Sequence, residues 1–143
     1  MANTKDVLAK GFTRFHQLLF DVSKGKVGGA AFGMPVLELH TVGAKSGADR
    51  TTMLTSPLVK GDQIILVASY GGDDRHPSWF HNLSANPNVD ITMKGVRRHY
   101  MARIVEGDER QGLWDELTAA HKNYADYQTK TDRQIPVIVL DPA

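Results

Sequence analysis

The chain has 143 residues, and its 17 lysines and arginines against 16 aspartates and glutamates give a formal net charge of +1. This length suffices for one domain with a buried core, and the balanced charge provides no global field to attract nucleic acid. Cysteine is absent, which excludes disulfides, a thiolate nucleophile and cysteine-ligated metals. No apolar run approaches the ~18 residues that span a bilayer, and the N-terminus lacks a signal-peptide core. We therefore expect a soluble, cytoplasmic protein.

The first 34 residues are expected to form a helix followed by a glycine-rich linker. Apolar residues recur at steps of three and four over residues 5–22, which predicts an amphipathic helix with one apolar stripe: Leu8, Phe12, Phe15, Leu19 and Val22. Such a stripe packs on the rest of the domain, on a membrane surface or on a partner, and these alternatives stay open. We expect a single domain over residues 1–143, with its main part at residues 35–143.

The remainder of the chain is rich in strands joined by tight turns. Lys60-Gly61-Asp62 and Lys94-Gly95 are typical of hairpin turns. The apolar run at residues 63–67 predicts a central strand, whereas Pro136 predicts an edge or an irregular start for the last one. Alternating and apolar runs predict strands at residues 36–42, 50–54, 57–59, 63–67, 88–93, 96–105 and 135–140.

Two further helices are predicted. Pro77 suits the first turn of a helix, where no amide donor is required, and Ala85-Asn86-Pro87 ends that helix. Another helix begins at Gly107-Asp108-Glu109, because acids in the first turn favour the helix dipole. These elements predict an antiparallel β-barrel of about six strands with three peripheral helices, in the α+β class and mainly β.

The turn at residues 43–50 has the composition of an anion-binding loop. Two glycines permit a tight turn with outward amides, and Lys45 and Arg50 add positive charge at the same rim. The alternative is a solvated hairpin turn with ordinary surface charges. The spacing does not match a phosphate-binding P-loop, and no dinucleotide fingerprint occurs in the chain.

Two later stretches could line a ligand site. Residues 67–72 end a strand with small residues, which permits close approach of a bound ring, and Ser69 could hydrogen-bond to that ring. Residues 77–82 combine the free amides of a helix start with Trp79 and Phe80, which suits a planar, partly anionic ligand. The alternative for both aromatic residues is a place in the core.

The sequence lacks a recognisable catalytic set of its own. Its six histidines form no pair at metal-ligand spacing with an acid, and no serine lies in a nucleophile-elbow motif. The basic stretch at residues 97–100 is too short to favour a nucleic-acid interface. A site with binding groups but no acid, nucleophile or metal set indicates that a bound cofactor performs the chemistry.

Several ordered motifs resemble the deazaflavin-dependent nitroreductase family, whose members are oxidoreductases with a split β-barrel fold related to flavin mononucleotide-binding oxidases. The resemblance extends from about residue 35 to residue 142. It rests on residues 41–52, 67–72, 76–83, 85–87, 124–128 and 131–136. It implies reduced 8-hydroxy-5-deazaflavin (coenzyme F-420) as hydride donor, and from the histidine spacing we expect no metal.

The resemblance also implies roles for individual residues. Tyr124 is similar to the family tyrosine that closes over the ring and meets substrate, with Tyr127 and Ser69 as further catalytic candidates. The expected contacts to the phosphate and tail are Ala44, Lys45, Ser46, Arg50, Thr51, Thr52, Met53, Leu54 and Thr55. The expected ring groove consists of Val67, Ala68, Ser69, Tyr70, Ser78, Trp79, Phe80, His81, Asn82 and Tyr124. Ala44, Asp49 and His121 depart from the usual family residues.

The implied reaction is hydride transfer to an electron-poor planar acceptor such as an enone, a coumarin-like lactone, a quinone or a nitroaromatic. Ser69 or a tyrosine hydroxyl would hydrogen-bond to the acceptor oxygen as charge develops there. The alternatives are a flavin mononucleotide- or haem-linked oxidase on the same fold, and a deazaflavin-binding carrier without catalysis. Two further expectations are a homodimer and contact of residues 5–22 with a membrane surface.

Overall fold

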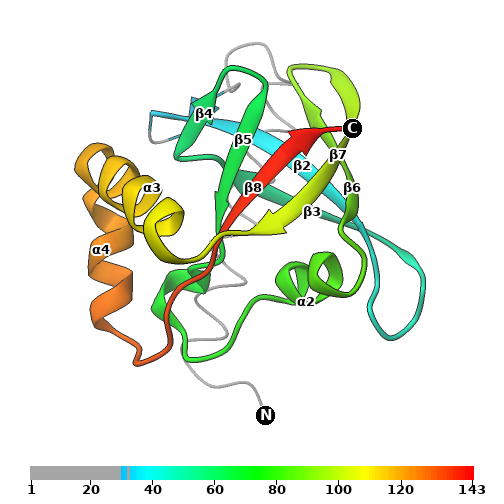
Figure 1. Cartoon of the computed structure of the whole chain (residues 1–143). Helices are drawn as coiled ribbons and strands as arrows, with labels where there is room; N and C mark the ends of the chain where they lie inside the picture. The colour runs from blue at the N-terminus through cyan, green and yellow to red at the C-terminus, as the bar shows by residue number, and fades with distance from the viewer. Residues whose placement is uncertain (1–29, 32) are drawn as a thin grey trace.

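A curled antiparallel sheet organises the molecule (Figure 1). The computed structural model describes residues 30, 31 and 33–143, so the expected helix at residues 5–22 and most of the linker lie outside the described residues. The strands are β1 (Ala30–Ala31), β2 (Met34–Val42), β3 (Asp49–Thr55), β4 (Leu58–Lys60), β5 (Gln63–Val67), β6 (Asn88–Met93), β7 (Val96–Ile104) and β8 (Val137–Pro142).

The strands follow the order β1-β2-β6-β7-β8-β5-β4, and β3 pairs with β2. All pairs are antiparallel, and the longest runs from Val36 opposite Thr55 to Val42 opposite Asp49. The expected class and the split-barrel fold are confirmed. The described residues form more strands than the expected six: each of the predicted runs forms a strand, with residues 57–59 corresponding to β4, and the two-residue β1 was not predicted.

The predicted hairpin turns are confirmed. Gly61 between β4 and β5 has φ +61°, and Lys94 and Gly95 between β6 and β7 have φ +52° and +78°. Turns of this kind need left-handed backbone, which glycine adopts at little cost. Residue choice at the turns therefore sets the register of both hairpins.

The core has two layers, one on each face of the sheet. On one face the apolar side chains pack with Trp79 and Leu83, and they include Leu37, Leu39, Ile64, Leu66, Ile138 and Leu140. On the other face the apolar side chains pack with Leu117 and Tyr124, and they include Ile65, Val137 and Val139. Because β5 contributes to both layers and lies between β4 and β8, its prediction as a central strand is confirmed.

In the described part of the chain, three helices and one short turn of 3₁₀ helix surround the sheet (Figure 1). Helix α2 (Ser78–Ala85) begins one residue later than expected, because Pro77 is its N-cap with extended backbone. Helix α3 (Gly107–Ala120) starts with Asp108 and Glu109, as predicted. Helix α4 (Lys122–Thr129) was not predicted, and the 3₁₀ turn is η1 (Tyr70–Gly72).

The last strand starts two residues later than expected. Pro136 precedes β8, and its carbonyl oxygen accepts a hydrogen bond from the Ala68 amide at 3.0 Å. Strand β8 lies between β7 and β5, so the edge alternative for Pro136 is wrong and the irregular start holds. A proline without an amide donor fits outside a central strand.

Candidate functional site

The loop between β2 and β3 is a tight turn closed by its own backbone. The Gly43 amide donates to the Ala48 carbonyl at 2.7 Å, and the Gly47 amide donates to the Gly43 carbonyl at 2.9 Å. The Ala48 amide donates to Ser46 Oγ at 3.2 Å. A Cβ on Gly43 would lie 2.7 Å from Ser46 Oγ and 3.3 Å from the Ala48 carbonyl oxygen, so a larger residue would displace the Ser46 side chain.

The charged groups of the loop face solvent. Lys45 and Arg50 are exposed, and Arg50 Nε lies 3.6 Å from the position of a Cβ on Gly43, so the guanidinium folds back over the turn. Fewer amides of the loop point outward than predicted, because those of Gly43, Ala44, Gly47 and Ala48 donate hydrogen bonds within the protein. Among the described residues, the amides of Lys45 and Ser46 have no partner, and with the two cations they form a donor set suited to an anion.

Helix α2 and the loop are joined directly. The Ala44 amide donates to Asn82 Oδ1 at 2.9 Å, and Asn82 Nδ2 donates to Thr41 Oγ1 at 3.3 Å. Figure 1 shows the β2–β3 hairpin extending past the end of the sheet near α2. The structure therefore brings the basic loop and the tryptophan-bearing helix together, 38 residues apart in sequence.

The aromatic residues of α2 differ in position. Trp79 is 6% exposed and belongs to the core cluster, so its ring supports the helix from inside. Phe80 is half-buried, with its ring centroid 4.6 Å from that of His76. Ser78 and His81 are exposed. Phe80 is thus the aromatic residue of α2 with a partly open face.

The segment from β5 to α2 is held by a residue that the sequence analysis did not select. Arg133 donates to the carbonyl oxygens of Asp73 at 2.8 Å, Ala68 at 3.2 Å and Ser69 at 2.9 Å. Burial lowers the pKa of this guanidinium from its ordinary value, but an arginine stays charged in proteins. It lies in the motif at residues 131–136, but nothing local indicates its role, because its partners lie some sixty residues away.

Among the predicted ring-groove residues on this segment, Ala68 is buried, whereas Val67, Ser69 and Tyr70 are half-buried. Tyr70, Gly71 and Gly72 are successive left-handed residues, with φ +46°, +65° and +85°. Left-handed backbone is costly for a residue with a side chain, so external contacts must stabilise this turn. The carbonyl contacts with Arg133 provide them.

The predicted catalytic tyrosines lie on α4, beside the sheet. Tyr124 is 5% exposed, and its hydroxyl donates to Met34 Sδ at 3.5 Å. Burial raises the pKa of Tyr124 to about 12, while a hydrogen bond with Thr55 lowers it and Tyr127 raises it. The phenol therefore stays protonated at neutral pH. Tyr127 is half-buried and its ring meets that of Tyr124 edge to face at 6.0 Å.

Strand β3 connects the two groups of predicted residues. Arg50 lies at its loop end, and Thr55 at its other end contacts Tyr124. The two residues are separated by about 17 Å of strand at about 3.3 Å per residue. Within the strand, Met53 is buried and Leu54 packs on the core, whereas Thr51 is exposed and Thr52 is half-buried. The exposed predicted contacts therefore concentrate at the loop end.

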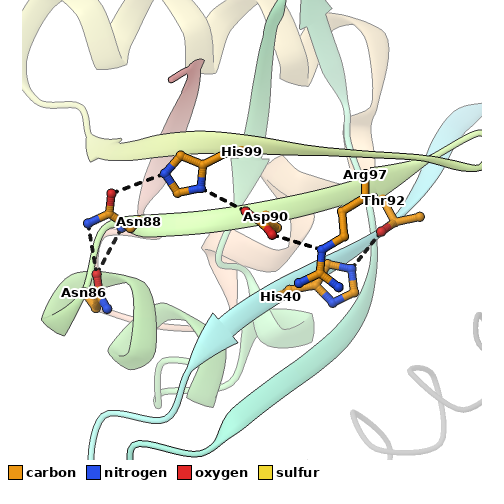
Figure 2. Close-up of polar contacts among 7 residues, drawn as sticks. All are labelled: His40, Asn86, Asn88, Asp90, Thr92, Arg97 and His99. Atoms are coloured by element: carbon orange, nitrogen blue, oxygen red, sulfur yellow. Dashed lines mark hydrogen bonds and ion pairs between the residues drawn. The ribbon is translucent and has the colours of Figure 1, made fainter.

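A second polar cluster spans β2, β6 and β7 (Figure 2). Asp90 accepts hydrogen bonds from Arg97 Nε and His99 Nδ1, both at 2.9 Å, and these bonds lower its pKa. His40 bonds to Thr92 Oγ1 at 2.8 Å, and burial lowers its pKa. A hollow of about 250 Å³ adjoins this cluster and reaches the loop. Because its charged groups already pair with one another, we interpret the cluster as a structural network that joins β2, β6 and β7.

Within the residues that the structure describes, no group of three histidine or acidic side chains could hold a metal ion. No helix among those same residues is both long and apolar enough to cross a membrane.

Comparisons with known proteins identify the family. The model of the F420H2-dependent quinone reductase family matches residues 12–142. The F420H2-dependent quinone reductase Rv1261c of Mycobacterium tuberculosis is 40% identical over 131 residues, covering 89% of this chain and 87% of the relative.

Solved structures agree. One described as an F420H2-dependent reductase (FDR-A) has a TM-score of 0.67 and 41% identity, covering 75% of this chain and 94% of that one. Another, described as a domain-swapped dimer, has a TM-score of 0.69 and 36% identity, covering 92% and 98%. The resemblance read from the motifs is confirmed, and with it the reductase class and reduced coenzyme F-420 as the hydride donor. The chain belongs to the F420H2-dependent quinone reductase family.

Proposed function

We propose that this chain binds reduced coenzyme F-420 with the acidic tail on the β2–β3 loop and the ring towards α2 and the β5–α2 segment, and reduces a quinone. The contact that carries this proposal is the hydrogen bond from the Ala44 amide to Asn82 Oδ1. It fixes the basic loop against the helix whose start was expected to line the ring.

The donor set of the loop fits the tail of the coenzyme. Lys45 and Arg50 supply positive charge, and the amides of Lys45 and Ser46 point to no partner among the described residues. Ser46 Oγ already accepts from the Ala48 amide, which leaves its hydroxyl hydrogen for a ligand. Arginine and lysine with converging amides are the groups that proteins use to hold phosphate.

When bound, the reduced coenzyme supplies the hydride. The residues of the chain would bind and orient the ring, exclude water and hold the acceptor. Tyr124 would act as a protonated hydrogen-bond donor, because its pKa of about 12 excludes a role as a base near neutral pH. Its present acceptor, Met34 Sδ at 3.5 Å, is weak and exchangeable for a substrate oxygen. Ser69 and Tyr127 remain proposed secondary contacts.

The acceptor class is inferred from the relatives. The relatives at 40% identity are named quinone reductases, so a quinone is the preferred substrate. Enones, coumarin-like lactones and nitroaromatics share the electron-poor planar ring and remain candidates. A flavin mononucleotide-dependent activity and a carrier without catalysis are the competing proposals.

The test is the absorbance decay of reduced coenzyme F-420 with menadione, a coumarin and a nitroaromatic. We expect decay with menadione, and the variant Lys45→Ala/Arg50→Ala should weaken coenzyme affinity roughly 100-fold because it loses two charge-assisted contacts. The control Lys94→Ala/Arg98→Ala makes the same charge change on the β6–β7 hairpin and should bind as wild type. Unchanged affinity of the loop variant would contradict the proposed tail site, and binding without decay would favour the carrier.

Assembly, location and membrane contact stand as subsidiary proposals. A related structure at 36% identity is described as a domain-swapped dimer, which supports testing for a homodimer by analytical ultracentrifugation. We propose a cytoplasmic enzyme whose residues 5–22 touch a membrane surface. Sedimentation with liposomes, with and without that segment, tests the contact, and equal sedimentation would exclude it.

A further inference from the structure

Arg133 holds both ends of the segment that joins β5 to α2. Its three carbonyl acceptors, on Ala68, Ser69 and Asp73, all lie on this segment, and its Nη1 also lies 3.3 Å from His76 Nδ1. The Arg133 guanidinium thus fixes the end of β5, the left-handed turn at residues 70–72 and His76. Arginine suits this role because its donors lie in a rigid planar fork.

This contact determines the protonation of His76. Arginine has donors and no acceptor, so His76 Nδ1 must be the nitrogen with the lone pair, and the proton lies on Nε2. Burial, Arg133 and His81 all lower the pKa of His76 from its ordinary value of 6.5. The carboxylates of Asp73 and Asp74 raise the pKa of Arg133 and so favour its charged form. His76 is therefore a neutral ring with a fixed N–H donor.

That donor has no partner within the described part of the chain. His76 is half-buried, its ring lies against Phe80 with centroids 4.6 Å apart, and its single hydrogen-bond contact is the one with Arg133. Ser69 and His76 are both tied to the same guanidinium. The Nε2 nitrogen of His76 reaches solvent, so water satisfies it in the free protein and a ligand oxygen can take the place of that water.

We propose that His76 Nε2 donates a hydrogen bond to a carbonyl oxygen of the planar ligand bound beside Ser69 and Phe80, and that Arg133 is the positioning residue that keeps this donor neutral and oriented. This inference rests on the proposed function. Both the deazaflavin ring and a quinone carry such an oxygen. On a quinone, negative charge develops at this oxygen during reduction, and a preorganised neutral donor stabilises it without giving up its proton.

Two substitutions separate the roles of the two ring nitrogens. His76→Asn retains an acceptor near the Nδ1 position for Arg133 and removes the Nε2 donor. His76→Gln places an amide donor near the Nε2 position and removes the acceptor for Arg133. Each variant is compared with wild type for coenzyme affinity by titration, for kcat and KM with menadione, and for thermal unfolding.

In His76→Asn we expect either kcat/KM for menadione or the coenzyme affinity to fall roughly 10- to 100-fold, as for the loss of one hydrogen bond to a charged or developing oxyanion. His76→Gln should retain most of the same quantity. A loss in kcat/KM for menadione assigns the oxygen to the acceptor, and a loss in coenzyme affinity assigns it to the deazaflavin. Unchanged function in His76→Asn, or an equal loss in His76→Gln, would overturn the inference. Wild-type protein that fails to bind the coenzyme would instead overturn the proposed function, and this inference with it.

Discussion

Replacing Gly72 by alanine should destabilise the protein far more than the same change at Gly71. Both glycines are left-handed, with φ +85° and +65°, and alanine in that conformation costs about 1 kcal/mol. At Gly71 a Cβ would meet nothing within 4 Å, whereas at Gly72 it would lie 2.8 Å from the Tyr127 carbonyl oxygen and 3.0 Å from Lys130 Cβ. Relieving that overlap adds about 1–3 kcal/mol.

The displaced groups end a helix, so they cannot move freely. The Tyr127 carbonyl accepts the Lys130 amide at 3.1 Å at the C-terminus of α4. Gly72→Ala should therefore lower the free energy of unfolding by about 2–4 kcal/mol, which lowers Tm by about 6–12 °C for a chain of this size. Gly71→Ala should lower it by about 1 kcal/mol.

Calorimetry of both variants under identical conditions measures this difference. Because Ser69 and His76 lie on the same segment, kcat/KM measured well below the melting range should also fall further in Gly72→Ala. Equal Tm values for the two variants would refute the account of how α4 and the β5–α2 segment pack.

Three other changes test separate contacts. Tyr124→Phe should reduce turnover with menadione more than coenzyme affinity, and equal losses in both would count against its role at the acceptor. Arg133→Met should lower the free energy of unfolding by about 3 kcal/mol, roughly 1 kcal/mol for each carbonyl that loses its donor. A Tm within 2–3 °C of wild type, a shift of about 1 kcal/mol at most, would contradict a stabilising role for the three hydrogen bonds from Arg133. The hydrogen bonds from His99 and Arg97 lower the pKa of Asp90 from its ordinary value. The stability that ionised Asp90 contributes is therefore complete above the unfolded-state pKa and is lost as pH falls through the folded pKa. Acid unfolding below about pH 4 should be less steep in Asp90→Asn, and identical profiles would contradict this.

Local patterns predicted the hairpins because their causes are local. Gly61 and Gly95 signal their turns directly, and the doubly apolar run of β5 requires burial on both faces. Helix α4 was missed because its segment has no acid in the first turn and starts directly after His121, which also ends α3. Pattern reading has no signal for two helices that share a capping residue.

Long-range contacts account for what the sequence could not predict about the site. The motifs placed Asn82 among the site residues, but its bond to the Ala44 amide appears only once the fold brings α2 to the loop. Arg133 and His76 both lie in motifs of the resemblance, but they are 57 residues apart and their contact appears only in the fold. Tyr124 and Trp79 show the reverse, since the resemblance implies site roles for both, yet they lie in the core clusters.

The most direct test is a crystal structure of the protein with oxidised coenzyme F-420. We predict that the phosphate lies within hydrogen-bond reach of Lys45, Ser46 and Arg50, and that the ring lies beside Ser69 and the start of α2. A phosphate held by His40 and Arg97 without Lys45 or Arg50, or a ring remote from α2, would contradict this prediction.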